Sequence, residues 1–172
     1  MPIMWNPEQK KDKFEELKKD INYLLEENIN LDTLMKKIVI LLKEKIDYYN
    51  WVGFYLIDPD KKDELILGPF EGDPTEHVRI PFGRGICGQA AETKLIFVVQ
   101  DVSKENNYLS CSPNVKSEIV LPILDEQGNV LGELDIDSHE LEPFSNQDKE
   151  FLEWICHQLS PLFKNKYNNV ES

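Results

Sequence analysis

Three kinds of feature are scarce in this chain of 172 residues. No apolar run approaches the ~18–20 residues that a membrane-spanning helix needs, and the start lacks a signal-peptide pattern. Cysteines number three, an odd count at wide spacings that does not fit a secreted disulfide framework. Basic residues number 19 against 32 acids, which gives a net charge of −13. Because such a surface repels phosphates, we expect no nucleic-acid or membrane partner. The missing signal pattern and the cysteine count lead us to expect a cytoplasmic protein.

Hydrophobic residues make up 41% of the chain, enough for one core, so we expect a single domain over 1–172. Its predicted parts are an N-terminal helix within 1–28, a core over about 30–163 and a loose tail over 165–172.

Apolar residues at helical spacing predict amphipathic helices over 9–27 and from Leu31 to about Asp47, the second capped by Asn30. A further helix is expected after Ser145, ending near Pro161 and Leu162.

Between these helices the sequence changes to strand-like patterns with one helical interruption at Gln89–Thr93. The expected strands are Trp51–Ile57, Glu64–Phe70, Val78–Pro81, Leu95–Val99 and a hairpin of Glu118–Leu124 with Asn129–Asp137. This order favours an α+β fold, with helices on one face of a mostly antiparallel sheet.

The hairpin carries the most informative pattern. Pairing Leu124 with Asn129 puts seven apolar residues on one face, which selects this register. The same register sets Glu118 opposite Asp135, with Asp137 diagonal to it, so three carboxylates converge on the other face. An acidic solvent-exposed face is one interpretation. Since like charges at this range destabilise each other, the alternative is a pocket for a cation or an ammonium group.

Neighbouring segments offer possible walls for such a pocket. Strand alternation places Trp51 and Tyr55 on one face, which would suit a small cation with an apolar arm, or would form a second core layer. The turn Gly83–Gly88 offers backbone amides at a helix start, a weak signal for an anion such as a carboxylate.

The cysteines divide into two kinds. Cys87 and Cys111 lie in loop-like sequence, where functional residues concentrate, and a helix N-terminus lowers the pKa of a thiol. Cys156 falls within the last helix, so we expect it in the core. Cys87, Cys111 and His77 are too few and too scattered for a zinc site, so no metal is expected.

The motifs Asn50–Tyr55, Leu67–Phe70, Val78–Gly88, Ser117–Val120 and Leu134–Ser138, in this order, resemble the free methionine-(R)-sulfoxide reductase branch of GAF domains. The resemblance extends over about residues 45–160. It implies a GAF sheet flanked by helices, a helical face used in a homodimer, and reduction of free L-methionine-(R)-sulfoxide. It further implies that thioredoxin restores the enzyme and that no bound cofactor is needed.

By position in these motifs, Cys111 matches the family's nucleophile and Cys87 its second cysteine. Glu118, Asp135 and Asp137 match the acids that hold the amino group of the substrate and assist at the sulfoxide oxygen. Trp51 and Tyr55 match the aromatic wall around its sulfur and methyl group. One departure is His77, where many members have the resolving cysteine, so Cys87 or an external thiol would have to resolve Cys111. The alternative function is a non-catalytic GAF module that senses a small molecule.

Overall fold

The computed structural model describes residues 5–109 and 112–171, with the backbone alone described from 164 onward. Its six strands form one sheet in the order β3-β2-β1-β6-β5-β4, and every neighbouring pair is antiparallel. The strands are β1 (Trp51–Ile57), β2 (Glu64–Glu71), β3 (Arg79–Pro81), β4 (Phe97–Val99), β5 (Ser117–Leu124) and β6 (Val130–Ser138). The predicted α+β class with an antiparallel sheet is confirmed.

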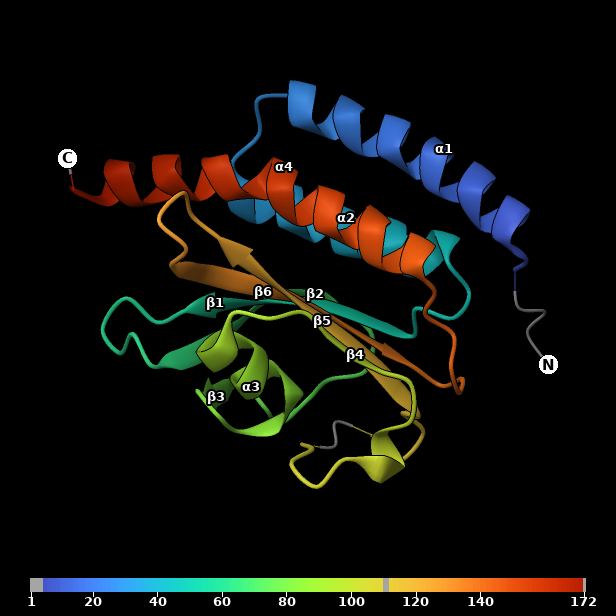
Figure 1. The fold of residues 1–172 in the computed structure, drawn as a ribbon. Helices are drawn as coiled ribbons and strands as arrows, with labels where there is room; N and C mark the ends of the chain where they lie inside the picture. Colours follow the sequence, from blue (N-terminus) through green and yellow to red (C-terminus); the bar gives the residue numbers. More distant parts are fainter. Residues whose placement is uncertain (1–4, 110–111, 172) are drawn as a thin grey trace.

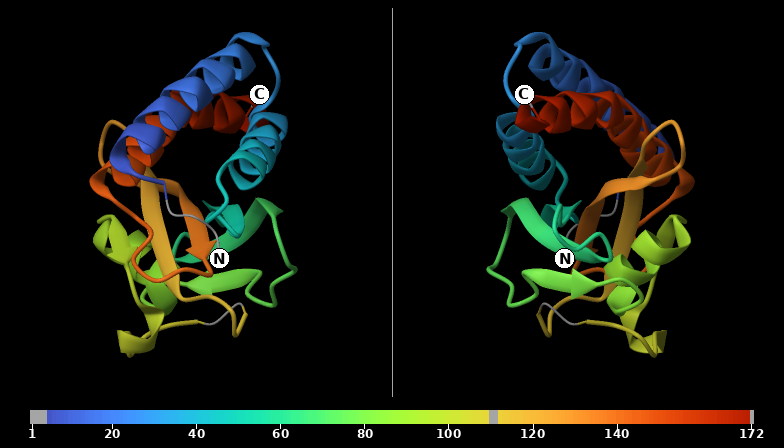
Figure 2. Two further views of the ribbon diagram at one scale, coloured as in Figure 1. Left: turned by 90° about the vertical axis from the view of Figure 1, so that its right-hand side faces the viewer. Right: turned by 90° about the vertical axis from the view of Figure 1, so that its left-hand side faces the viewer.

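Helices lie on both faces of this sheet, but unequally (Figures 1 and 2). One face is covered by α1 (Pro7–Glu26), α2 (Leu31–Lys45) and α4 (Asn146–Glu171), and the main core lies between them and the sheet. The short helix α3 (Gly85–Thr93) packs on the opposite face, over β5 and β6. A second apolar cluster gathers beneath α3, together with the 3-10 turn Val102–Lys104. No described helix is long and apolar enough to cross a membrane.

Asparagine side chains begin both N-terminal helices. Asn6 and Gln9 form a reciprocal capping box at the start of α1, with each side chain accepting from the other's backbone N–H at 2.8 Å. Asn30 accepts from the backbone N–H of Thr33 at 2.8 Å, so the predicted cap of α2 is confirmed.

The last helix is longer than predicted. We expected it to end near Pro161 and Leu162, but α4 runs on to Glu171, so the predicted end of the helix is wrong. A proline inside a helix removes one hydrogen bond. Leu159 and Phe163, four positions apart, are both buried in the main core on either side of Pro161. The apolar face therefore continues through the proline, and its packing opposes the break.

The register of the β5–β6 hairpin also differs from the prediction. The backbone N–H of Asp125 donates to Asn129, and Gly128 has a positive φ of 82°, so the turn has three residues rather than four. Leu131 is then an extra residue, because Leu124 pairs with Val130 whereas Ile123 pairs with Gly132. Each irregularity shifts the pairing by one residue. Beyond the bulge, the total shift of two leaves the side chains on their predicted faces but changes their partners.

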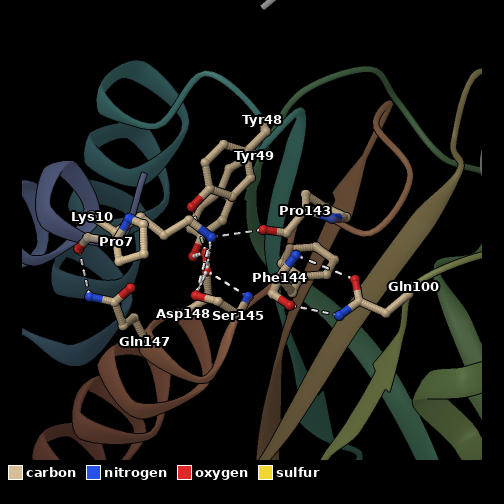
Figure 3. Close-up of polar contacts among 10 residues, drawn as sticks. All are labelled: Pro7, Lys10, Tyr48, Tyr49, Gln100, Pro143, Phe144, Ser145, Gln147 and Asp148. Carbon is tan, nitrogen blue, oxygen red and sulfur yellow. Dashed lines mark hydrogen bonds and ion pairs between the residues drawn. The ribbon is translucent and has the colours of Figure 1, made fainter. Parts of the chain in front are cut away.

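One buried ion pair joins the first and last helices (Figure 3). Lys10 on α1 contacts Asp148 on α4 at 2.6 Å, and side-chain exposure is 5% for the lysine and 0% for the aspartate. The other carboxylate oxygen of Asp148 accepts from the hydroxyls of Tyr48 and Tyr49 at 2.7 and 2.8 Å. Lys10 also donates to the carbonyl of Pro143 at 2.8 Å. This network fixes α1, α4 and the segment leading into β1 relative to one another.

Removing the lysine charge from this network should destabilise the protein. We predict that Lys10→Met lowers the free energy of unfolding by about 3 kcal/mol, because it leaves the buried Asp148 without its cation. Urea unfolding followed by circular dichroism measures the change. Lys37→Met is the matched control, since Lys37 and Glu27 form a half-exposed pair at 3.4 Å and should change stability by less than ~1 kcal/mol. Equal effects of the two substitutions would contradict the role assigned to Lys10.

Candidate functional site

The central strand β6 carries two different faces. Leu134 and Ile136 point into the main core beneath α1, α2 and α4. The alternate residues point to the face that α3 covers, because successive side chains of a strand point to opposite sides. Three of these alternate residues are acids: Glu133, Asp135 and Asp137.

Cross-strand pairing surrounds these acids with specific neighbours. Asp137 pairs with Trp51 of β1 and with Glu118 of β5. The prediction had set Asp135 opposite Glu118, which is wrong by the two-residue shift of the hairpin; Asp135 instead pairs with Val120. Because the shift is even, Glu118, Asp135 and Asp137 still share one face, as the sequence indicated.

All of these carboxylates are buried, with exposed fractions of 6% for Glu118 and 1% for Asp135 and Asp137. The alternative of a solvated acidic face is therefore wrong. One oxygen of Asp135 and one of Asp137 make no hydrogen bond among the described residues. Burial raises the pKa of both aspartates, and for Asp137 the neighbouring charge of Asp135 raises it further. The site thus holds carboxyl groups that retain protons at higher pH than ordinary aspartates.

Sequence reasoning missed a fourth acid on this face. Glu133 is fully buried, and neither of its carboxyl oxygens has a hydrogen-bond partner among the described residues. Burial, and next the charge of Asp135, raise the pKa of Glu133 well above its ordinary value. The signal was present in the sequence, because the alternation that places Asp135 and Asp137 on this face gives Glu133 the same face.

Cys87 lies in the first turn of α3, directly over the acids. Its Sγ donates a hydrogen bond to Glu118 Oε2 at 3.9 Å, and the cysteine is 5% exposed. Ligand atoms of Cys87, Glu118 and Asp135 lie within 4.8 Å of one another, close enough to surround one small cation. The sequence had suggested a lowered thiol pKa at this helix start. Instead the pKa of Cys87 is raised, first by burial and then by the charge of Asp135, both of which outweigh the helix terminus.

The other two cysteines, Cys156 and Cys111, are not among the described residues of this site. Cys156 is buried in the main core on the far side of the sheet, its Sγ 4.0 Å from the carbonyl of Leu121, so the predicted core thiol is confirmed. Cys111, the predicted nucleophile, lies outside the described residues.

Aromatic side chains form the wall beside the acids. Trp51 and Tyr55 lie on the same face of β1 with ring centroids 6.4 Å apart, and both are buried. The Trp51 indole lies directly over Gly53, where an added Cβ would come within 2.3 Å of the ring. The indole donates to the carbonyl of Asp73 at 3.0 Å, and the Tyr55 hydroxyl donates to that of His77 at 2.9 Å. Both rings are thus held in fixed positions next to the carboxylates.

A small cavity lies at the centre of this arrangement. Its volume is about 10 Å³, room for roughly one water molecule. The residues around it include Tyr55, His77, Cys87, Glu118 and Asp135. A ligand of amino-acid size can enter only if part of this wall moves outward.

The glycine-rich turn gives limited support for an anion site. The backbone amides of Gly83 and Gly88 donate to carbonyls of the turn itself, and the amide of Arg84 donates to the carbonyl of Pro81 in β3. The amide of Gly85 donates to the side chain of Asn107 at 2.8 Å. Four of the turn's amides are thus already used within the protein.

Comparison with known proteins agrees with this geometry. The GAF domain model matches residues 30–161. The chain is 34% identical over 149 residues to a free methionine-R-sulfoxide reductase of Escherichia coli, covering 87% of each chain. This chain belongs to the free methionine-R-sulfoxide reductase family of GAF domains.

Two further comparisons are informative, one with a related protein and one with a solved structure. GAF domain-containing protein A of Dictyostelium discoideum is 40% identical over 146 residues, covering 85% of this chain and 89% of its own. The structure of free methionine-R-sulfoxide reductase from Neisseria meningitidis in complex with its substrate superposes with a TM-score of 0.82. It shares 35% identity and covers 91% of each chain. The fold expected from the resemblance is confirmed by these matches.

The buried acids should make stability depend on pH. Because their pKa values are raised in the folded protein, the native state keeps protons that the unfolded chain loses above pH ~4. Stability should therefore fall as the pH rises from about 5 to 8, by up to ~1.4 kcal/mol per pH unit for each such group. We predict that Asp137→Asn reduces this slope and is more stable than the parent at pH 8. Urea unfolding at several pH values measures it.

Glu126→Gln is the control for this prediction, because Glu126 is exposed in the β5–β6 turn. It should keep the parental slope. A slope that Asp137→Asn leaves unchanged would mean that the carboxyl of Asp137 does not retain its proton in the native state.

Proposed function

We propose that this protein reduces free L-methionine-(R)-sulfoxide to methionine, using its own thiols as the reductant. The observation that carries the proposal is a set of buried carboxylates that lie together with two aromatic rings and a thiol. Family membership supports the same reaction, because relatives with this fold are named for it.

The carboxylates suit the amino group of a free amino acid. Glu118, Asp135 and Asp137 are buried at one place, and unpartnered oxygens of the two aspartates are available as hydrogen-bond acceptors. An ammonium group placed among them would supply the missing donors and the missing positive charge. Its binding would also favour ionisation of the acids, which releases protons within the site.

The aromatic wall suits the other end of the substrate. Trp51 and Tyr55 offer apolar ring surface next to the acids, against which a thioether or sulfoxide methyl group can pack. The fixed separation between acids and rings would select a short unbranched side chain on a free amino acid.

Cys111 is the proposed nucleophile. Its thiolate attacks the sulfoxide sulfur, and the sulfoxide oxygen takes up protons that a carboxyl of raised pKa donates. Methionine leaves, and the oxygen remains as a sulfenic acid on Cys111. Overall one thiol and one sulfoxide become one sulfenic acid and one thioether.

Cys87 is the proposed resolving thiol. Its sulfur attacks the Cys111 sulfenic acid, which forms a disulfide and releases water. Thioredoxin then reduces the disulfide by thiol exchange, so no bound cofactor takes part. His77, at the wall of the cavity, offers no thiol, which leaves Cys87 as the internal candidate.

Cysteine variants test this assignment. We expect Cys111→Ser to abolish NADPH-coupled reduction of the free R-sulfoxide by thioredoxin and its reductase. Cys87→Ser should stop turnover but still release about one equivalent of methionine per protein, because the first step does not use Cys87. Rapid quench with chromatography measures that first equivalent. Cys156→Ser, in the core on the far side of the sheet, is the matched control and should keep full activity.

The sensor alternative makes the opposite prediction for the thiols. Titration of free thiols before and after addition of the sulfoxide should show the loss of two thiols for the enzyme. An unchanged thiol count in the absence of any reductant would overturn the proposed reaction.

Recognition of the amino group has its own test. We predict that N-acetyl-methionine-(R)-sulfoxide is reduced with a kcat/KM at least ~100-fold lower, since it loses two or more charge-assisted hydrogen bonds. Steady-state kinetics with both substrates measures the ratio. Asp137→Asn should reduce the ratio by slowing only the free substrate. Equal rates for the two substrates would contradict an ammonium site.

A further inference from the structure

Cys87 and two of the acids lie close enough together to hold one metal ion. The Sγ of Cys87 and one carboxylate oxygen each of Glu118 and Asp135 all lie within 4.8 Å of one another. They come from three separate elements, α3, β5 and β6. Three donors held by three elements leave a further coordination position open. The expectation against zinc took only Cys87, Cys111 and His77 into account, so the carboxylates change the outcome.

The space between the donors fits a metal ion. The cavity that they line has a volume of about 10 Å³, room for roughly one water molecule. Zinc binds oxygen and sulfur at ~2.0–2.3 Å, which places two ligand atoms of a tetrahedral site roughly 3.6 Å apart. Cys87 Sγ and Glu118 Oε2 are 3.9 Å apart. Zinc therefore needs only a small inward movement of its ligands, whereas an amino acid needs the wall to move outward.

A buried acceptor in the same place points to a cation. Asp135 lines the cavity and is 1% exposed, and one of its carboxylate oxygens has no hydrogen-bond partner among the described residues. The basic side chain among the described residues around the cavity is Arg84, which is exposed. A buried carboxylate is stable when it is paired or coordinates a metal. A divalent cation between the donors would meet that requirement.

The thiol determines which kind of ion fits. Ca²⁺ takes six to eight oxygen ligands, and Mg²⁺ requires an octahedron of oxygens. One sulfur and two carboxylate oxygens are too few for the first ion and of the wrong chemistry for the second. Sulfur donors favour zinc and related transition metals, and three protein ligands with one open position are typical of zinc.

We propose that Cys87, Glu118 and Asp135 form a binding site for Zn²⁺, and that the ion occupies the place of the substrate's amino group and excludes the substrate. Zinc replaces the proton of the Cys87 thiol, which passes to solvent; an S–Zn bond forms and nothing is oxidised or reduced. The ion is an inhibitor and not a resident cofactor, because it occupies both the acids and a thiol. Exclusion of the substrate rests on the proposed function, whereas zinc binding itself does not.

Zinc binding is measured first, without substrate or turnover. The starting protein is Cys111→Ser, because Cys111 lies outside the described residues; it leaves Cys87 and Cys156, since the chain has three cysteines. Competition with a chromophoric chelator gives the stoichiometry and affinity for Zn²⁺. Co²⁺ in place of zinc reports a thiolate ligand through its charge-transfer absorption. We expect one equivalent of zinc and a thiolate–cobalt band, neither of which a large excess of Mg²⁺ removes.

Substitutions in this background identify the ligands. Cys87→Ser should remove the cobalt band and weaken zinc binding at least ~100-fold, because loss of a group that only supports a ligand already costs ~10–100-fold. Asp135→Asn should weaken binding about 100-fold. Its matched control is Asp137→Asn, equally buried on the same face but not one of the three donors, which should weaken binding less than ~10-fold. Cys156→Ser, on the far side of the sheet, should change nothing. Circular dichroism verifies folding.

Displacement tests the overlap with the substrate. Saturating free methionine-(R)-sulfoxide should release zinc from the Cys111→Ser protein to the chelator, whereas the N-acetyl form should not. In the protein with all its cysteines, zinc should raise the KM for the sulfoxide, and a chelator should reverse the effect.

Four outcomes would overturn the inference. A cobalt spectrum without a thiolate band would exclude Cys87 as a ligand. Equal weakening by Asp135→Asn and Asp137→Asn, or displacement by Mg²⁺, would mean that zinc is attracted by negative charge in general. Retention of zinc at saturating sulfoxide, in a protein that reduces this sulfoxide, would show that the two sites are separate.

Discussion

The structure depends on one constraint: the central strand β6 must be apolar on one face and acidic on the other, with both faces buried. Its neighbours β1 and β5 hold it on both edges, so its side chains cannot rotate away from the core. Leu134 and Ile136 anchor the sheet to the helices. The acids on the opposite face are thereby forced beneath α3, where burial raises the pKa of Asp135 and Asp137. The proposed chemistry follows from the uncompensated charge that this strand introduces.

Sequence patterns predicted the faces of the strands correctly but not the pairs across them. Alternation along one strand depends only on the parity of position, so it placed Asp135 and Asp137 on one face of β6, and an even shift of the hairpin keeps Glu118 on that face with them. Which residues lie opposite depends on the turn. A three-residue turn ending in Gly128 and a bulge at Leu131 each shift the pairing by one, and neither leaves a mark in the hydrophobic pattern.

The errors in the helices and thiols have a common physical origin. A proline predicts a helix end from local geometry, but burial of Leu159 and Phe163 continues the helix through Pro161. A helix start predicts a reactive thiol from the local dipole, but burial and the acids raise the pKa of Cys87. In both cases a tertiary environment outweighs a local preference, and that environment comes from segments far away in the sequence. Glu133 is a different case, because the sequence did carry its signal. The alternation that places Asp135 and Asp137 on one face of β6 places Glu133 on the same face.

The chain buries two kinds of acid. One kind has its charge compensated and stabilises the fold, whereas the other kind keeps oxygens without partners in the candidate site. Asp148 is surrounded by an ammonium group and two hydroxyls, so its charge is compensated and it links the helices. Asp135 and Asp137 have unpartnered oxygens and no basic side chain among their described hydrogen bonds. A fold that can satisfy one buried carboxylate so fully has the means to satisfy the others. That it leaves one oxygen of each aspartate without a partner, beside a thiol, is expected if a cation supplied from solution, the ammonium group of the substrate, completes the site.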